Sequence, residues 1–170
     1  FCCFDQDGNI IAYDELYRNK TTVRDLCGIY RAQLEALSVN PIYCVGDPSI
    51  AQTNAITGTS IQTEYMEHGV GIALGNNNVS AGITRCQNRF QAKKLFITER
   101  CSETLREIKN YRWDRYASAK IENRRNKKEV PLKKDDHCMD ALRYGVMSRP
   151  ALSGEEENTS LGNFLNAPLA

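Results

Sequence analysis

The chain has 170 residues, of which 41% are hydrophobic and 25% are charged, a balance that is typical of a globular domain. No apolar run reaches the length of a membrane span and no signal-peptide pattern is present, so we expect no membrane partner. The seven cysteines include no CxxC pair and are expected to be the reduced thiols of a cytoplasmic protein.

Charge is distributed unevenly along the chain. The formal net charge is only +1, so overall basicity does not point to a nucleic-acid partner. Basic residues nevertheless crowd into Lys120–Lys134, and three glutamates follow at 155–157. The segment 151–170 is rich in Gly, Ser, Asn and acidic residues, which predicts a flexible C-terminal tail after one domain over residues 1–150.

The first elements of the chain form a predicted hairpin. Phe1–Phe4 is apolar, Asp5–Asn9 contains the Asp-Gly pair that is typical of tight turns, and Ile10–Tyr17 returns as a second strand. The chain begins without Met, inside the first of these strands. We therefore expect a fragment of a longer protein whose sheet opens with antiparallel strands.

A helix and a buried strand are predicted next. Apolar residues recur at helical spacing from Val23 to Leu37, and Asn40-Pro41 ends the pattern. The short apolar run Ile42–Val45 then predicts a strand that ends at Gly46-Asp47-Pro48. Functional side chains of α/β sheets tend to lie where strands end. Asp47 is therefore a candidate site residue, and an ordinary turn aspartate is the alternative.

Helices and strands alternate over the rest of the chain. The expected elements are a helix over 60–67, a strand over 69–74, a helix over 79–90, a strand over 94–98, a helix capped by Ser102, a charged hairpin over 112–132 and a final helix over 137–148. This pattern predicts an α/β fold with a mixed central sheet, antiparallel opening strands and helices on both faces. An RNase H-like fold is among those that fit.

The segment 135–144 carries the most chemical information. His137 and Asp140 are three residues apart and share one face of the final helix, while Asp136 is a natural N-cap. Such a pair beside lysines is a suitable metal site facing a polyanion, and the alternative is a cap and an ordinary surface histidine. Apolar residues are expected to hold this helix on a core, namely Met139, Leu142 and Val146.

The order Asp-His-x-x-Asp-Ala-x-Arg-Tyr over 136–144 resembles the closing motif of the nuclease domain of phage large terminases. Further likenesses occur in family order over residues 1–150, namely the Asp-Gly turn, Gly46-Asp47-Pro48, Gly69-Val70 and the segment Glu-Ile-Lys-Asn-Tyr-Arg-Trp at 107–113. The resemblance implies an RNase H-like endonuclease domain that cleaves concatemeric double-stranded DNA during viral genome packaging in the host cytoplasm.

The resemblance also implies a metal site. Members of this family hold two Mg²⁺ or Mn²⁺ ions on three acidic positions. Asp47 and Asp140 match two of these positions, His137 is a further ligand or proton carrier, and Asp136 is a cap or an outer ligand. The family's first carboxylate lies on an opening strand that we expect to precede this chain. Asp5 and Asp7 are alternatives, although their turn context favours a role in the hairpin.

Several basic side chains are expected to contact DNA phosphates without sequence preference, or else to form a solvated surface: Arg124, Arg125, Lys127, Lys128, Lys133 and Lys134. Arg143 is expected to pair internally, and Tyr111, Trp113 and Tyr144 to lie in the core. The sequence contains no Walker-type phosphate loop. The resemblance therefore implies an upstream ATPase motor domain as a partner, with the portal, the procapsid and the small terminase subunit as further candidates.

Two other interpretations of the sequence remain open. One is another RNase H-like nuclease of the resolvase or transposase type, which would differ in its DNA substrate. The other is a docking module for DNA or assembly partners without chemistry of its own. A docking module should show no Mn²⁺ effect on its melting temperature that depends on Asp47 and Asp140.

Overall fold

The computed structural model describes residues 1–113 and 131–148. Four of the predicted DNA-contacting residues, Arg124, Arg125, Lys127 and Lys128, and the predicted tail over 151–170 lie outside the described residues. The strands are β1 (Cys2–Phe4), β2 (Ile10–Ala12), β3 (Cys44–Gly46), β4 (Ile72–Leu74) and β5 (Leu95–Ile97). The helices are α1 (Val23–Leu37), η1 (Pro48–Ala51), α2 (Ile61–Glu67), α3 (Val79–Gln91), α4 (Ser102–Asn110) and α6 (His137–Met147).

The opening hairpin forms as predicted. β1 pairs with β2 in antiparallel register, with Phe4 opposite Ile10. The Asp5 carboxylate fastens the turn, because its two oxygens accept from the backbone N–H and the side-chain amide of Asn9 at 2.7 and 2.6 Å. Gly8 supplies the positive φ of 77° that this turn requires. These contacts support the hairpin role that the turn context predicts for Asp5.

The strands form a mixed sheet arrangement, which confirms the predicted fold class. β2 pairs with β5 in parallel, which gives the strand order β1-β2-β5, and β3 pairs with β4 in parallel. Among the described residues these are two separate short sheets rather than one central sheet. Within that part of the chain, β1 is consequently an edge strand of the first sheet, and both strands of the second sheet have an unpaired edge.

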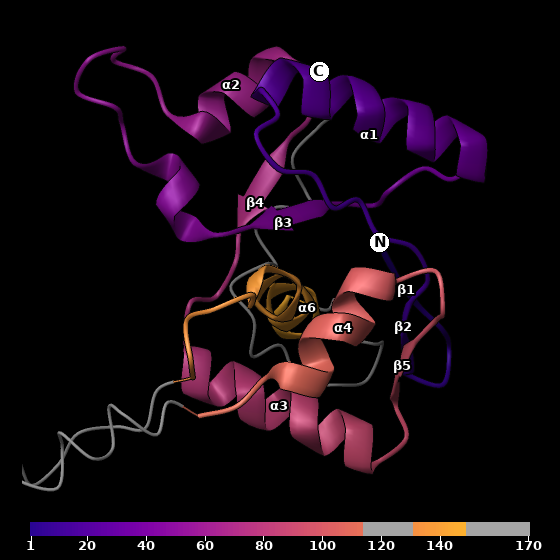
Figure 1. The fold of residues 1–170 in the computed structure, drawn as a ribbon. Coiled ribbons are helices and arrows are strands. Elements are labelled where there is room, and N and C mark those ends of the chain that lie inside the picture. The colour runs from indigo at the N-terminus through magenta and orange to yellow at the C-terminus, as the bar shows by residue number, and fades with distance from the viewer. Residues whose placement is uncertain (114–130, 149–170) are drawn as a thin grey trace, which may run out of the picture.

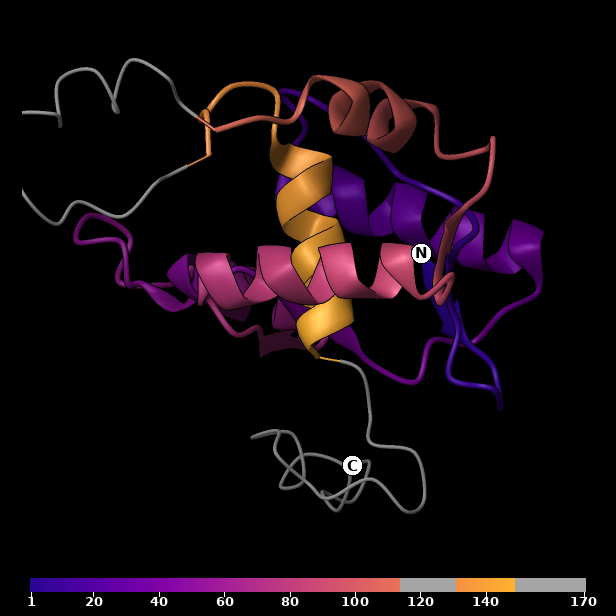
Figure 2. The same ribbon diagram turned by 90° about the horizontal axis from the view of Figure 1, so that it is seen from below.

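Helices lie on both sides of the strands. Figure 1 shows α1 and α2 on one side of β3 and β4, with α6 on the other side. Figure 2, seen from below, shows α3 crossing in front of α6, and these two helices make the most extensive contact between elements. No helix in the described ranges is long and apolar enough to cross a membrane.

The core confirms the apolar faces predicted from the sequence. It is built by residues of β2, β5 and α6 together with the residue that precedes α4: Ile10, Ala12, Leu95, Cys101, Met139, Leu142 and Val146. Cys86 and Phe90 of α3 pack against it, and Val146 is completely buried. α6 therefore lies at the centre of the molecule, and its first two turns carry the candidate site residues His137 and Asp140.

The end of β2 and the position of Trp113 differ from the local predictions. β2 ends at Ala12 rather than Tyr17. The residues after Ala12 do not continue the strand. Asp14 is buried, with 7% of its surface exposed, and its carboxylate forms an ion pair with Arg100 at 2.9 Å. Trp113 is 39% exposed rather than part of the core. It forms an antiparallel bridge with Pro131, which is the pairing expected at the base of the predicted hairpin.

Candidate active site

Asp47 occupies the turn that follows β3. Pro48 favours an extended backbone at Asp47 (φ −60°, ψ 132°), so the side chain can cap the short helix η1. One carboxylate oxygen accepts from the Ser49 N–H at 2.7 Å, and the other accepts from the Tyr144 hydroxyl at 2.7 Å. These donors, the Ser49 N–H foremost and then the Tyr144 hydroxyl, lower the pKa of Asp47. Asp47 is therefore held ionised and in a fixed position.

Asp140 lies on the first turn of α6 and is surrounded by cations. Its two oxygens lie 3.2 Å from the Arg143 guanidinium and 3.2 Å from the Lys133 ammonium. The same ammonium lies 3.3 Å from Asp136. Burial alone would lower the pKa of Lys133, but Asp140 and Asp136 outweigh burial and raise it. A positive charge thus already sits between these two carboxylates.

Two consecutive residues of α6 connect Asp47 with Asp140. Arg143, 2% exposed, pairs with Asp140 and stacks over the ring of Tyr144 with its guanidinium carbon 4.3 Å from the ring centroid. Tyr144, 4% exposed, donates to Asp47. The internal pairing of Arg143 and the burial of Tyr144 confirm the sequence-based predictions. A continuous network therefore joins the end of β3 to the first turn of α6.

The asparagine loop before α3 completes this network. The Asn76 carbonyl accepts from Arg143 at 3.3 Å, and the Asn77 side-chain oxygen lies 3.0 Å from the Tyr144 hydroxyl. Gly75 and Gly82 permit the close approach of the two large side chains. A Cβ would lie 2.5 Å from the Tyr144 ring at position 75 and 2.4 Å from the Arg143 stem at position 82. Sequence reasoning missed the part that this loop plays, because its partners on α6 lie 67 residues away.

His137 lies apart from this network. It is exposed and lines a hollow of about 370 Å³ with residues 16–19, Cys138 and Ala141. Among the described residues, none of the hydrogen bonds or ion pairs of Asp47 and Asp140 involves His137. Its role as a metal ligand stays a prediction. Lys134 is exposed, whereas Lys133 is engaged by the two aspartates.

Asp136 stands at the N-cap position of α6 as predicted, but its side chain forms no capping hydrogen bond. The fully buried carboxylate of Glu107, on α4, takes that role instead. One of its oxygens accepts from the N–H groups of Cys138 and Met139 at 2.7 and 3.3 Å. The first turn of α6, which carries Asp140, is thereby fastened to α4.

α4 is fastened in the same way. Ser102 was expected to cap this helix, but it is the first helical residue, and the side chain at the N-cap position makes no capping bond. Glu15 accepts instead from the N–H groups of Glu103 and Thr104 at 2.6 and 3.0 Å and from the Thr104 hydroxyl at 2.8 Å. Two glutamates from distant segments therefore orient the helix pair that carries the site.

The described residues do not form a complete metal-binding group. Asp47 and Asp140 carry the hard oxygen atoms that Mg²⁺ and Mn²⁺ prefer as ligands, and the Lys133 ammonium already forms an ion pair with Asp140. However, no three His, Cys, Asp or Glu side chains within residues 1–113 and 131–148 gather as a metal-binding group. At least one further ligand would be needed.

The sequence is similar to that of a phage protein. The chain is 29% identical over 83 residues to the large terminase subunit of Escherichia phage T5, a match that covers 48% of this chain and 18% of that protein. No protein-family model matches the chain. The chain thus corresponds to a small part of a much longer relative.

Solved structures show the same fold. The nuclease domain of the phage P22 large terminase matches with a TM-score of 0.65 at 18% identity, covering 85% of this chain and 70% of that domain. The large terminase of a thermophilic bacteriophage matches with a TM-score of 0.62 at 21% identity, covering 82% of this chain and 33% of that protein. The fold is therefore that of a large-terminase nuclease domain, and the resemblance seen in the sequence is confirmed.

Proposed function

We propose that this chain is the nuclease domain of a viral DNA-packaging terminase and that it cleaves concatemeric double-stranded DNA by metal-dependent hydrolysis. The observation that carries the proposal is the network in which Tyr144 and Arg143, neighbours on α6, hold Asp47 and Asp140. Carboxylates fixed from two different elements are what a divalent-metal nuclease requires. The fold match to terminase nuclease domains supports the same conclusion.

In the proposed reaction, Asp47 and Asp140 would bind Mg²⁺ or Mn²⁺. The chemistry that two such ions supply is activation of the attacking water and stabilisation of the leaving oxygen. The protein itself keeps Asp47 ionised, through the hydrogen bonds from Ser49 and Tyr144 that lower its pKa. It also sets the direction of Asp140, through Arg143. We propose His137 and Asp136 as outer groups of this site.

The missing ligand is proposed to come from an additional strand that pairs with the edge of β1 that no strand of the described residues covers. β1 and β3 lie near one another, because Tyr30 stacks on Phe1 with the ring centroids 5.8 Å apart and its hydroxyl lies 3.1 Å from the Cys44 thiol. An added strand beside β1 would satisfy the unpaired backbone of that edge. It would also bring a new carboxylate toward Asp47 at the end of β3.

The partners follow from the same proposal. We propose four partners for this nuclease domain: an ATPase motor domain on the same polypeptide, the small terminase subunit, the portal and the procapsid. Lys134 and the basic residues at 124–128 are proposed DNA contacts. Plasmid DNA can test the nuclease function in the absence of the other partners.

The proposal is tested by nicking of supercoiled plasmid with Mn²⁺, with Mg²⁺ and with chelator, both by this chain and by a longer chain that carries the proposed additional strand. We expect metal-dependent nicking that Asp47→Asn and Asp140→Asn each reduce by at least about 100-fold, because each removes a charged ligand. Asp135→Asn is the matched control, since Asp135 is exposed and lies beside the site. Equal activity of Asp140→Asn and Asp135→Asn would contradict the assignment.

A docking module without chemistry is the second candidate. It is favoured by the Lys133 ammonium, which lies within ion-pair distance of both Asp140 and Asp136 and offsets part of their negative charge. A folded protein that stays inactive even when it carries the proposed additional strand, and whose melting temperature does not respond to Mn²⁺, would support this candidate. A metal response that depends on Asp47 and Asp140 would reject it.

A further inference from the structure

The outer face of α3 carries no acidic side chain. Residues 69–98, which include the whole of α3, contain four Lys or Arg residues and no Asp or Glu, although the chain has 21 acidic residues in all. The inner face of α3 is occupied, because Gly82 and Ile83 are buried and Gly82 packs on the Arg143 stem. The outer face is left without a covering element among the described residues (Figure 2).

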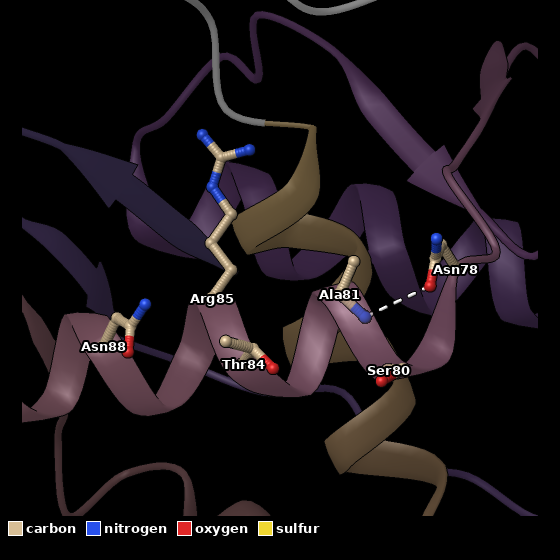
Figure 3. Close-up of a pocket in the computed structure, with 6 residues that line it drawn as sticks. All are labelled: Asn78, Ser80, Ala81, Thr84, Arg85 and Asn88. Atoms are coloured by element: carbon tan, nitrogen blue, oxygen red, sulfur yellow. Dashed lines mark hydrogen bonds between the residues drawn. The ribbon is translucent and has the colours of Figure 1, made fainter. Parts of the chain in front are cut away.

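This outer face carries a row of small polar side chains. Ser80, Thr84 and Asn88 are all exposed and follow one another at intervals of four residues, which places them about 6 Å apart along the helix axis. Arg85 stands beside the row and extends from α3 alongside α6 (Figure 3). These residues border an open hollow of about 500 Å³ whose lining is Asn78, Ser80, Ala81, Thr84, Arg85 and Asn88.

The row begins at the candidate active site. Asn78 caps α3, with its side-chain oxygen accepting from the Ala81 N–H at 3.1 Å. The two preceding residues contact the site directly, since Asn77 lies against the Tyr144 hydroxyl and the Asn76 carbonyl accepts from Arg143. A linear ligand that lies along α3 would therefore reach the network of Asp47 and Asp140 at the N-terminal end of the helix.

We propose that the outer face of α3 binds the phosphate backbone of duplex DNA and guides it to the candidate active site. Hydroxyl, amide and guanidinium groups are among those that contact DNA phosphates in proteins, and such contacts position the duplex without reading its sequence. The absence of carboxylates from residues 69–98 removes the repulsion that a polyanion would otherwise meet. The inference rests on the proposed nuclease function for the identity of its ligand.

The test is the affinity of the full chain for a fluorescent duplex of about 30 base pairs, measured by anisotropy over a range of salt concentrations. Thr84→Glu and Arg85→Glu each place a negative charge on the outer face. We expect each to weaken binding about tenfold at low salt, and Arg85→Glu to reduce the slope of log affinity against log salt by about 1. Circular dichroism melting verifies that both variants fold, as the exposure of Thr84 leads us to expect.

Arg24→Glu is the matched control, because it reverses an exposed arginine on α1, on the opposite side of the molecule (Figure 1). Affinity of Thr84→Glu and Arg85→Glu equal to that of Arg24→Glu would overturn the inference, as would a wild-type chain that does not bind duplex DNA. Loss of nicking in Asp140→Asn together with unaffected binding in the α3 variants would leave the proposed function standing and the inference rejected. Salt-sensitive binding that the α3 variants weaken, without any nicking, would support the inference about α3 and reject the proposed nuclease function.

Discussion

Among single residues, Tyr144 has the most connected role in the site. Its hydroxyl donates to Asp47 and its ring supports the Arg143 guanidinium. Burial first, and then the hydrogen bond to Asp47, raise the pKa of Tyr144. The hydroxyl therefore keeps its proton and remains a donor across the physiological pH range. Removal of the Tyr144 hydroxyl should therefore change mainly the pKa of Asp47.

We predict that Tyr144→Phe raises the pKa of Asp47 toward its ordinary value of 3.8. A lowered carboxyl pKa stabilises the folded state above the ordinary pKa, and that contribution disappears as pH falls through the folded-state pKa. The variant should therefore lose more unfolding free energy relative to wild type at about pH 6 than in strong acid. Carboxyl-carbon NMR titration measures the pKa. An unchanged pKa of Asp47 would show that the hydroxyl does not act on it.

Among the helices, the orientation of α6 depends on α4. Glu107 binds the first N–H groups of α6, and Glu15 binds those of α4. Both carboxylates act where a local capping residue would normally act, at the positive end of a helix. The chain of contacts runs from the segment after β2 through α4 to the turn that bears Asp140. Helix placement is therefore a long-range property here.

We predict that Glu107→Ala destabilises the protein by about 2–4 kcal/mol, because two N–H groups lose a charged acceptor. Glu107→Gln keeps one carbonyl acceptor and should cost about half as much. Hydrogen exchange should show the loss first at the amides of Cys138 and Met139. Glu103→Ala is the control, since its ion pair with Arg106 is partly exposed and should be worth less than about 1 kcal/mol. Equal effects of Glu107→Ala and Glu103→Ala would refute this account.

In the domain as a whole, α6 joins two sheets that do not pair with each other. Position 145 lies against the Cys2 thiol of β1, with 3.9 Å between that sulfur and a Cβ placed there. At the end of α6 the Ser148 carbonyl accepts from Tyr43, beside β3, at 2.8 Å. Val146 lies between these contacts and is fully buried. α6 therefore contacts both sheets and contributes to holding them in one domain.

We predict that Val146→Ala lowers the unfolding free energy by about 1–3 kcal/mol through lost burial and a residual cavity. Amides of β2 and of β3 should lose hydrogen-exchange protection to the same extent, because both sheets rest on α6. Ala36→Ser, at an exposed position of α1, provides the control and should change neither sheet. Loss of protection in one sheet alone would show that the two sheets unfold independently.

Local patterns were sufficient for the helices but not for the site network. The apolar spacing of Val79 to Phe90 and of Met139 to Val146 predicted two helices and their buried faces. The position of Asp47 after an apolar run made it a candidate residue, and the structure places it in the network with Tyr144; its role as a metal ligand stays a prediction. The capping roles of Glu107 and Glu15 were missed because their partners lie 31 and 88 residues away in sequence. The hollow beside His137 and the exposure of Trp113 likewise depend on tertiary packing that no short window contains.

Arg143 and Tyr144 are consecutive residues of α6 and contact two different aspartates, so the site should be sensitive to insertions and deletions in this helix. Consecutive residues of an α-helix differ by about 100° in direction around its axis. The two side chains reach Asp140 and Asp47 from this fixed angular offset. Deletion of Met139 would shift all later residues of α6 by about 100° relative to the turn that Glu107 binds. Either Glu107 would lose its N–H partners, or Arg143 and Tyr144 would no longer point toward Asp140 and Asp47. This turn should therefore accept substitutions far more readily than changes in its length.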